Sequence, residues 1–417
     1  MRSFSSPGLL LLVALCAGCG SIAPLVRAAG ASATAPEEYH LYAGSTHAHT
    51  QFTWSHGEQW AAGSGGEKKG KLNVSPEGVQ GPPGGSKLKN EWQQNQGTPA
   101  DHFARAKAQH FDFYATTDHS QESAFNPPAR DNPAWVESHQ QARAATDASF
   151  VALSGYEHSE NNGPDGKGHF NVLNSAEYLN ALAPGVDLRK FYQWLQHAAS
   201  AGEGPVVASF NHPGASQYNE WAYRDDGVTD VITMLEVINS NKNIHYAGFL
   251  AALDHGWKVS PVCGNDNHGF YGITRHTSRT FVLATSRTQA ALLDAMKHRR
   301  TYASLEQNLE CRYTANGAIM GSTLEQPARI EFAITISDPD TNEPQDRITK
   351  IDLVTDGGAI AAACTPTPAH RVTWTPVIAP ATGKYYFVRV WNAGGGDLPN
   401  AKPDDPVAWL APVWTGR

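Results

Sequence analysis

Two histidines separated by one residue, His47 and His49, are the first side chains in the sequence whose type and spacing suggest chemistry. They follow the apolar run 40–43, which predicts a β-strand, and residues two apart on a strand project from the same face. Neutral imidazole is the commonest protein ligand for zinc and related ions, so this spacing suits one metal ion. A chain with 18 histidines also produces such pairs by chance, and two solvated or core histidines are the alternative interpretation.

Similar side chains recur where later predicted strands end. The sequence predicts five helices, at residues 99–108, 133–146, 188–200, 245–253 and 289–300. The predicted strands between and around them are 111–117, 150–154, 168–173, 205–210, 231–238, 257–262 and 279–284. Strands that alternate with helices indicate an α/β fold with a mostly parallel sheet that is buried on both faces.

The strand ends are where the polar residues gather. In a closed α/β barrel the C-terminal ends of the strands converge on one mouth. The side chains that would meet there are His47, His49, His119, Glu157, His212, Asp266 and His268. One histidine at a strand end is usually structural, whereas several successive strands that end in His, Asp or Glu indicate a shared site. The pattern therefore predicts a metal centre at the mouth of the barrel.

The alternation of strands and helices is interrupted before the first predicted helix and ends near residue 310. Residues 62–98 are rich in Gly, Lys, Ser, Pro and Gln and predict a long loop, either a functional lid or a simply mobile segment. Residues 311–417 alternate with period two and predict a small, sandwich-like antiparallel β domain. Its Trp374, Trp391, Trp409 and Trp414 could form a carbohydrate platform, but core positions are the favoured interpretation.

Residues 1–28 have the pattern of an export signal. Arg2 gives a positive start, residues 9–15 are apolar, and small residues follow. The run Cys16-Ala17-Gly18-Cys19 resembles a bacterial lipobox in which Cys19 would be acylated, and residues 26–28 form a competing cleavage site. We therefore expect an exported protein that is periplasmic, anchored to the membrane as a lipoprotein through Cys19, or secreted.

Composition argues against some partners and sites. A net charge of -8, a pI near 6.1 and the lack of a long basic run argue against a nucleic-acid partner. With Cys16 and Cys19 set aside, Cys263, Cys311 and Cys364 allow at most one disulfide and form no Cys-x-x-Cys metal site. Most of the three are expected to be buried as small hydrophobic residues. The sequence leaves the oligomeric state open.

Six short motifs occur in a set order along the chain: Thr46-His47-Ala48-His49-Thr50, Ala115-Thr116-Thr117-Asp118-His119, Gly155-Tyr156-Glu157, Gly168-His169, Asn211-His212-Pro213-Gly214 and Asn265-Asp266-Asn267-His268. In this order they resemble the PHP (polymerase and histidinol phosphatase) family, and within it the CehA/McbA-like metallohydrolases. The resemblance covers residues 39–310. It implies a distorted (β/α)7 barrel over residues 37–310 that holds two or three divalent ions, followed by the β domain of residues 311–417.

The resemblance also implies which residues hold the ions. Its three ligand groups are His47, His49, Glu157 and Asp266 for one ion; Glu157, His169 and His212 for a second; and His56, His119 and His268 for a third. His56 stands where many relatives have Asp, and His169 is nearer to Glu157 than in some branches. Glu157 is the natural bridge, because a carboxylate can join two cations through its two oxygens and an imidazole cannot. Zinc suits the histidine-rich shell, and manganese and iron are alternatives.

The activity implied by the resemblance is hydrolysis of a small-molecule ester by a metal-bridging hydroxide, with a phosphomonoester or phosphodiester as the expected substrate. Hydrolysis of a carbamate or carboxylic ester, as in CehA-type relatives, is the alternative. A non-catalytic metal- or glycan-binding surface protein is a third hypothesis, and the intact ligand set argues against it. The sequence contains no Gly-x-Ser-x-Gly motif that would support a serine nucleophile.

Glu157, Asp118 and His119 are the predicted catalytic residues. Asp118 could be a metal ligand, a proton carrier or a partner that orients an imidazole, and the last role is favoured. His158, next to Glu157 but on the opposite face of a strand, is expected to be structural. Four residues near or after strand ends are candidates for binding a substrate anion: Arg224, Arg275, His276 and Arg279.

Overall fold

The computed structural model describes residues 38–53, 96–160, 168–240, 243–269, 271–396 and 404–417, together with four short strands between residues 60 and 88. Residues Tyr39–Arg417 form one compact unit. The predicted export signal 1–28 with Cys19, the predicted ligand His56, and most of the predicted loop 62–98 lie outside the described residues. Among the helices of the described ranges, none is long and apolar enough to cross a membrane.

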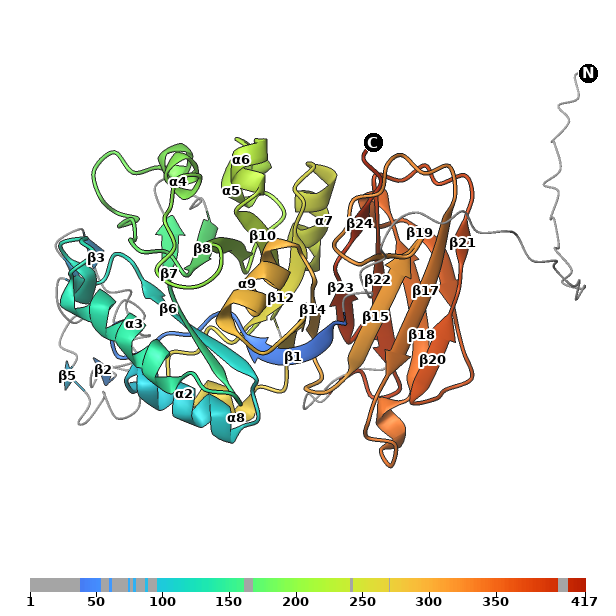
Figure 1. The fold of residues 1–417 in the computed structure, drawn as a ribbon, viewed down its shortest axis with the longest axis horizontal. Helices are drawn as coiled ribbons and strands as arrows, with labels where there is room; N and C mark the ends of the chain where they lie inside the picture. Colours follow the sequence, from blue (N-terminus) through green and yellow to red (C-terminus); the bar gives the residue numbers. More distant parts are fainter. Residues whose placement is uncertain are drawn as a thin grey trace, which may run out of the picture. The chain divides into compact units, whose positions relative to one another are not determined.

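The chain up to Ser304 alternates strands and helices, coloured blue to light orange in Figure 1. Its strands are β1 (His40–Ser45), β2 (Trp60–Ala61), β3 (Val74–Ser75), β4 (Gly78–Val79), β5 (Lys87–Leu88), β6 (Phe113–His119), β7 (Val151–Glu160), β8 (Gly168–Leu173), β9 (Val207–Asn211), β10 (Ile232–Asn239), β11 (Asn243–Ile244), β12 (Ser260–Gly264), β13 (Arg279–Ala284) and β14 (Thr301–Ser304). Its helices are α2 (Pro99–Ala108), α3 (Pro133–Ala145), α4 (Leu188–Leu195), α5 (Gln217–Trp221), α6 (Asp226–Thr229), α7 (Tyr246–Asp254), α8 (Tyr271–Arg275) and α9 (Gln289–Lys297).

The rest of the chain is almost entirely β-structure. Its strands are β15 (Glu310–Ala315), β16 (Ala318–Ile319), β17 (Ile330–Ser337), β18 (Ile348–Val354), β19 (Ile360–Cys364), β20 (Arg371–Trp374), β21 (Val377–Ile378), β22 (Tyr385–Asn392), β23 (Ala408–Leu410) and β24 (Val413–Trp414). They are drawn in orange to red in Figure 1.

Most predicted elements are present, and local chemistry explains their ends. Helix α2 has the predicted bounds, because Thr98 and Asp101 form a capping box and Pro99 occupies the first turn. The predicted helix 188–200 was too long, since α4 ends at Leu195. Residues 199–201 instead exchange backbone hydrogen bonds with residues 174–176, which stops the helix from continuing.

Strand β7 was predicted too short, and its length matters for the site. It runs through to Glu160 because it pairs with β6 in parallel on one side and with β8 in antiparallel on the other. This double pairing holds Glu157 opposite His119 of β6 and Asn171 of β8. A residue in the middle of a paired strand has little freedom, so the carboxylate is held in one place.

The main sheet is mixed, with parallel pairs between β1 and β6, β6 and β7, β9 and β10, and β10 and β12. Strand β8 lies antiparallel between β7 and β9. The sheet curves until β12 meets β1, where Thr46 N donates to Cys263 O (3.4 Å) and Asp266 N donates to His47 O (3.0 Å). The predicted α/β class with parallel strands is therefore confirmed.

The core at the starts of these strands is closed by α9. Leu292, Leu293 and Met296 of that helix belong to the same buried cluster as Val151 of β7 and Val262 of β12. Parallel strands begin at one edge and end at the other, so an apolar helix against the starts leaves the opposite edge for polar residues.

The C-terminal strands form two antiparallel layers around a shared apolar core. On β17 buried and more exposed residues alternate, as the period-two pattern predicted. Trp391, Trp409 and Trp414 are buried, which confirms the core interpretation for these three, and Trp374 is only partly buried.

Cys263 and Cys311 are buried and all three described cysteines are free thiols.

The two parts of the unit share one sheet. Strand β14 pairs with β13 on one side and with β23 on the other, with Tyr302 opposite Leu410. The main sheet therefore continues from β1 through β13 and β14 into β23, β22, β18 and β19. The predicted division at residue 310 stays a prediction, and hydrogen-bonded strands cross it.

Candidate metal centre

The predicted ligands that the structure describes lie at one edge of the curved sheet. His47 and His49 directly follow β1, His119 ends β6, His212 follows β9, and Asp266 and His268 follow β12. Because β8 is antiparallel, its first residues lie at this same edge, and His169 is paired with Asn211, the last residue of β9. The edge is the one that α9 does not cover.

Glu157 is at the centre of this group. Its Oε2 lies near the Nε2 atoms of three histidines: His119 (2.8 Å), His49 (3.5 Å) and His47 (3.6 Å). Its Oε1 lies near Asn211 Nδ2 (3.0 Å), His169 Nδ1 (3.1 Å) and His212 Nε2 (3.4 Å). The two carboxylate oxygens therefore face two separate sets of imidazoles.

Three of these side chains, those of His47, His49 and Glu157, offer ligand atoms within 4.8 Å of one another, and Asp266 adjoins the two histidines. The atoms are His47 Nε2, His49 Nε2, Glu157 Oε2 and Asp266 Oδ1, and the five separations measured among them run from 3.0 to 3.6 Å. Zinc bonds of about 2.0–2.2 Å in a tetrahedron separate neighbouring ligand atoms by roughly 3.3–3.6 Å. Nitrogen and oxygen donors of this kind suit a divalent ion such as zinc.

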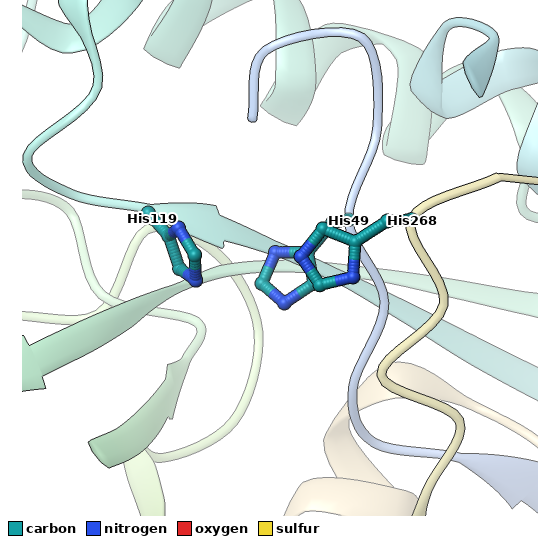
Figure 2. A group of neighbouring side chains, drawn as sticks. All are labelled: His49, His119 and His268. Carbon is teal, nitrogen blue, oxygen red and sulfur yellow. The ribbon is translucent and has the colours of Figure 1, made fainter. Parts of the chain in front are cut away.

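A second and a third ligand group share members with the first. Glu157, His169 and His212 offer ligand atoms within 4.8 Å of one another, and so do His49, His119 and His268. Figure 2 shows the last three, which come from three separate segments of the chain. The ring centroids of His49 and His268 are 4.2 Å apart, and those of His49 and His119 are 4.5 Å apart. The predicted contribution of His56 to this group lies outside the described residues.

Three of the histidines have an outer partner that sets the orientation of the ring. Nδ1 of His47 is 2.7 Å from Glu236 Oε1, and Nδ1 of His119 is 3.3 Å from Glu122 Oε1. Nδ1 of His49 is 3.3 Å from Thr53 Oγ1. Such partners select the tautomer of a metal-binding histidine, and here they turn each Nε2 toward the cluster.

Glu236, Glu122 and Thr53 were not identified from the sequence. Glu236 was the most visible of the three, because it is the one acidic residue in the otherwise apolar predicted strand 231–238. It is fully buried and also accepts hydrogen bonds from His212 N (2.9 Å) and Asn239 Nδ2 (3.1 Å). A buried carboxylate needs such partners, so an acid inside an apolar strand is a usable signal.

Asp118 lies outside the three ligand groups. Its carboxylate accepts hydrogen bonds from Thr50 N, Thr50 Oγ1 and Thr53 Oγ1, each at 2.7 Å. Burial raises the pKa of Asp118 to about 6, although these donors act to lower it. Thr53 connects the residue to His49, and the predicted catalytic role of Asp118 stays a prediction.

Two of the four candidate substrate residues, Arg279 and Arg224, have neighbours outside the ligand groups. Arg279 donates to the carbonyl oxygens of His276 (2.7 Å) and Ser278 (2.9 Å), and its guanidinium lies 3.7 Å above the Phe111 ring. Arg224 lines a separate cavity with Arg189, and Arg275 is exposed at the end of α8. Their part in substrate binding stays a prediction.

His158 has the surroundings of a structural residue. Its ring stacks on Phe191 with centroids 3.9 Å apart, and Nδ1 lies 3.2 Å from Leu179 O.

The charges in the cluster compensate one another. Burial would lower the pKa of His47, but Glu236, Asp266 and Glu157 raise it well above its usual value. Burial likewise opposes the charged form of His119, yet hydrogen bonds to Glu122 and Glu157 raise its pKa to about 10. Burial and the nearby His119 lower the pKa of His49 to about 3. The carboxylates therefore attract positive charge, from protons or from metal ions.

The site is closed at the back and open on one side. The side chains of His47, His49 and Glu157 are at most 1% exposed, whereas those of Asp266, His169 and His212 are 17%, 21% and 25% exposed. His212 and Asp266 have positive φ angles of 34° and 46°, a region that costs energy for residues other than glycine. The backbone is thus bent at two ligands on the open side.

Comparisons with known proteins gave a limited result. No protein-family model matches the chain, and no curated protein matches it. A solved structure from Bacteroides vulgatus, described as a two-domain protein with a predicted PHP-like metal-dependent phosphoesterase, is similar at 15% identity and a TM-score of 0.44, covering 90% of this chain and 95% of that one. A candidate metal-dependent phosphoesterase from Bifidobacterium adolescentis is similar at 13% identity and a TM-score of 0.25, covering 42% of this chain and 84% of that one.

The Glu236→Gln variant tests whether the outer carboxylate holds His47 in place for metal binding. The amide keeps the volume but removes the anionic partner of Nδ1, so we expect metal affinity to fall by about 10–100-fold. Competition titration with a chromogenic chelator measures the change. Glu203→Gln, the same substitution at an exposed position, should bind metal like the parent protein. Equal affinity of both variants would contradict this role for Glu236.

Metal binding should release protons near neutral pH. His119 has a pKa raised to about 10 and His47 one raised well above its usual value, so we expect both rings to be cationic in the metal-free protein, and each must lose the proton on Nε2 before that atom can bind a metal. Affinity should therefore rise as the pH increases from about 6 toward the pKa of His119. Calorimetric titration in buffers of different ionisation enthalpy counts the protons, and a count of zero would show that these imidazoles are neutral.

Proposed function

We propose that the protein is a metal-dependent hydrolase that cleaves a phosphomonoester or phosphodiester at this centre. The observation that carries the proposal is the position of Glu157, whose two oxygens face two separate sets of histidines. A carboxylate placed in this way can bridge two ions. Sites with paired divalent ions are common in enzymes that hydrolyse phosphoesters.

We propose an assignment of residues to each ion. His47, His49 and Glu157, with Asp266 beside the two histidines, would hold the first, and Glu157, His169 and His212 the second. His119 and His268, which lie together with His49, would hold a third with His56, which is outside the described residues. Imidazole and carboxylate donors suit zinc, and they also accept manganese or iron. When bound, such ions lower the pKa of water and neutralise the charge that develops on an ester under attack.

The protein's own residues position the ligands and the substrate. Asn211 donates to Glu157 Oε1 (3.0 Å), which keeps the carboxylate plane from rotating. The buried side chains of His47 and His49 exclude water from the back of the site. An ester would approach over His169 and His212, because these two ligands are the more exposed ones.

The fold proposed for this site is the distorted (β/α)7 barrel of the PHP type, in the CehA/McbA-like arrangement. Its support is the ring of seven strands β1, β6, β7, β8, β9, β10 and β12, in which backbone hydrogen bonds connect β12 back to β1. The reversal of β8 within this ring is the distortion, and it brings His169 to the ligand edge.

We also propose that the protein is exported, on the pattern of residues 1–28. If Cys19 is acylated, Cys19→Ser should move the mature protein from the membrane fraction to the soluble fraction. Cell fractionation with N-terminal sequencing distinguishes the two routes. Unchanged partitioning, with a mature chain that begins near Ala29, would favour ordinary signal cleavage.

The Glu157→Gln variant tests the proposed bridge. One anionic oxygen becomes an NH2 group that cannot bind a metal, so at least one ion should be lost and hydrolysis should fall by well over about 100-fold, more than the loss of an outer partner causes. The measurements are bound metal by elemental analysis and hydrolysis of p-nitrophenyl phosphate, bis-p-nitrophenyl phosphate and 1-naphthyl methylcarbamate. Folding is compared by circular dichroism.

Two controls accompany Glu157→Gln. Asp118→Asn changes a residue outside the ligand groups, and its activity should stay within about 10–100-fold of the parent activity. Glu203→Gln should have the same activity as the parent protein. A Glu157→Gln protein with its full metal content and activity within tenfold would place the bridge elsewhere. If only the carbamate is hydrolysed, the protein is a metal-dependent hydrolase, but its substrate is a carbamate and not a phosphoester. A metal-loaded protein that is inactive on all three substrates would favour a binding function.

A further inference from the structure

A second cluster of possible metal ligands lies in the β-structure after residue 310. The loop between β17 and β18 reads Asp338-Pro339-Asp340-Thr341-Asn342-Glu343-Pro344-Gln345-Asp346 and ends in a short 3-10 helix, Pro344–Asp346. One carboxylate oxygen from each of Asp338, Asp340 and Asp346 lies within 4.8 Å of the others. Asp338 and Asp346 are only 2% and 6% exposed, so this is not an ordinary solvated acidic loop.

Asp338 supplies the observation that points to a ligand. Its Oδ1 accepts a hydrogen bond from Asp340 N (2.8 Å), but its Oδ2 is buried and has no hydrogen-bond partner. No lysine, arginine or histidine of the described residues forms an ion pair with it. A buried, ionised oxygen without a donor is costly, and it is rarely kept in a protein unless a cation or an ordered molecule satisfies it.

The surroundings add negative charge rather than neutralise it. The pKa of the buried Cys311 thiol is raised well above its usual value, first by burial and then by the charges of Glu306, Asp338 and Glu310. The neighbouring polar groups are already engaged, since Asn308 Nδ2 donates to Asp340 Oδ2 (2.7 Å) and His370 Nε2 contacts Glu343 O (2.9 Å). Residues 338–346 themselves contain no lysine, arginine or histidine.

We infer that Asp338, Asp340 and Asp346 hold a calcium ion in this loop. The side-chain donors are all oxygens, which suits a hard cation such as calcium and not zinc. Oxygen-bearing side chains at 338, 340, 342 and 346 have the spacing of positions 1, 3, 5 and 9 of a helix-flanked calcium loop. The glycine at position 6 and the glutamate at position 12 of such loops are replaced here by Glu343 and Thr349, so backbone oxygens or water would complete the shell.

The ion would fasten three segments of the C-terminal layers. Asp338 N already donates to His370 O (2.7 Å), and Asn308 binds Asp340, so the loop touches the segments before β15 and before β20. None of the three aspartates belongs to the ligand groups of the barrel. The proposed calcium site is therefore structural and independent of the catalytic proposal.

Calorimetric titration of the full-length protein with calcium chloride tests the inference. After dialysis against buffer treated with a chelating resin, we expect about one calcium ion per chain, with a dissociation constant at or below about 10⁻³ M, the range of extracellular calcium modules. Calcium should also raise the melting temperature by a few degrees, roughly 2–6 °C, because a ligand that binds only the folded chain stabilises it. Magnesium at the same concentration should have a smaller effect.

Two variants and one matched control locate the ion. Asp338→Asn and Asp340→Asn should each weaken calcium binding at least tenfold and remove most of the thermal shift, with the metal content of the barrel unchanged. Asp340 is exposed, so its variant decides the question if Asp338→Asn folds poorly. Glu325→Gln, an exposed acid in the same layers, should bind calcium like the parent. No binding by the parent at millimolar calcium, or equal binding by Asp340→Asn, would overturn the inference.

Discussion

The buried carboxylate of Glu157 is the group on which the site depends. It is 1% exposed, and imidazoles that arrive after β1 and from β6, β8 and β9 surround it. An ionised carboxylate in the interior is stable only when positive charge and donors satisfy it. His47, His169 and His119 do so here and hold the pKa of Glu157 well below its usual value against the effect of burial. Several of the same nitrogen atoms belong to the groups that could hold a metal ion.

Much of this arrangement could be predicted from the sequence because it follows the direction of the strands. Parallel strands end at one edge, so His47, His119 and His212 had to meet once the alternation of strands and helices was recognised. His169 was different, since it starts a strand instead of ending one, and only the resemblance pointed to it. The structure supplies the physical reason, because β8 runs antiparallel and its start lies at the ligand edge.

The outer partners were harder to predict because the sequence does not show which side chain each of them contacts. Glu236 contacts His47 across 189 residues of sequence, and that contact depends on the register of β10 against its neighbours. Gly264 of β12 is part of the same fit, because a Cβ there would overlap Glu236 Oε1 and lie 2.8 Å from His47 Cβ. The length of α4 was predicted wrongly for a related reason. The helix stops because residues 199–201 form backbone hydrogen bonds with residues 174–176, and the local periodicity of the sequence does not reveal such long-range pairing.

The continuity of the sheet through β14 has a consequence for how the chain can be divided. Strand β14 follows α9, the helix that covers the starts of the strands, and its outer edge is satisfied by β23, which lies more than a hundred residues later in the sequence. A chain cut near residue 310 would leave that edge with unpaired N–H and C=O groups, the kind of surface that recruits strands from other molecules. Strand β23 thus protects the edge of the α/β part from other strands, and the pairing of β14 cannot be completed until β23 has been synthesised.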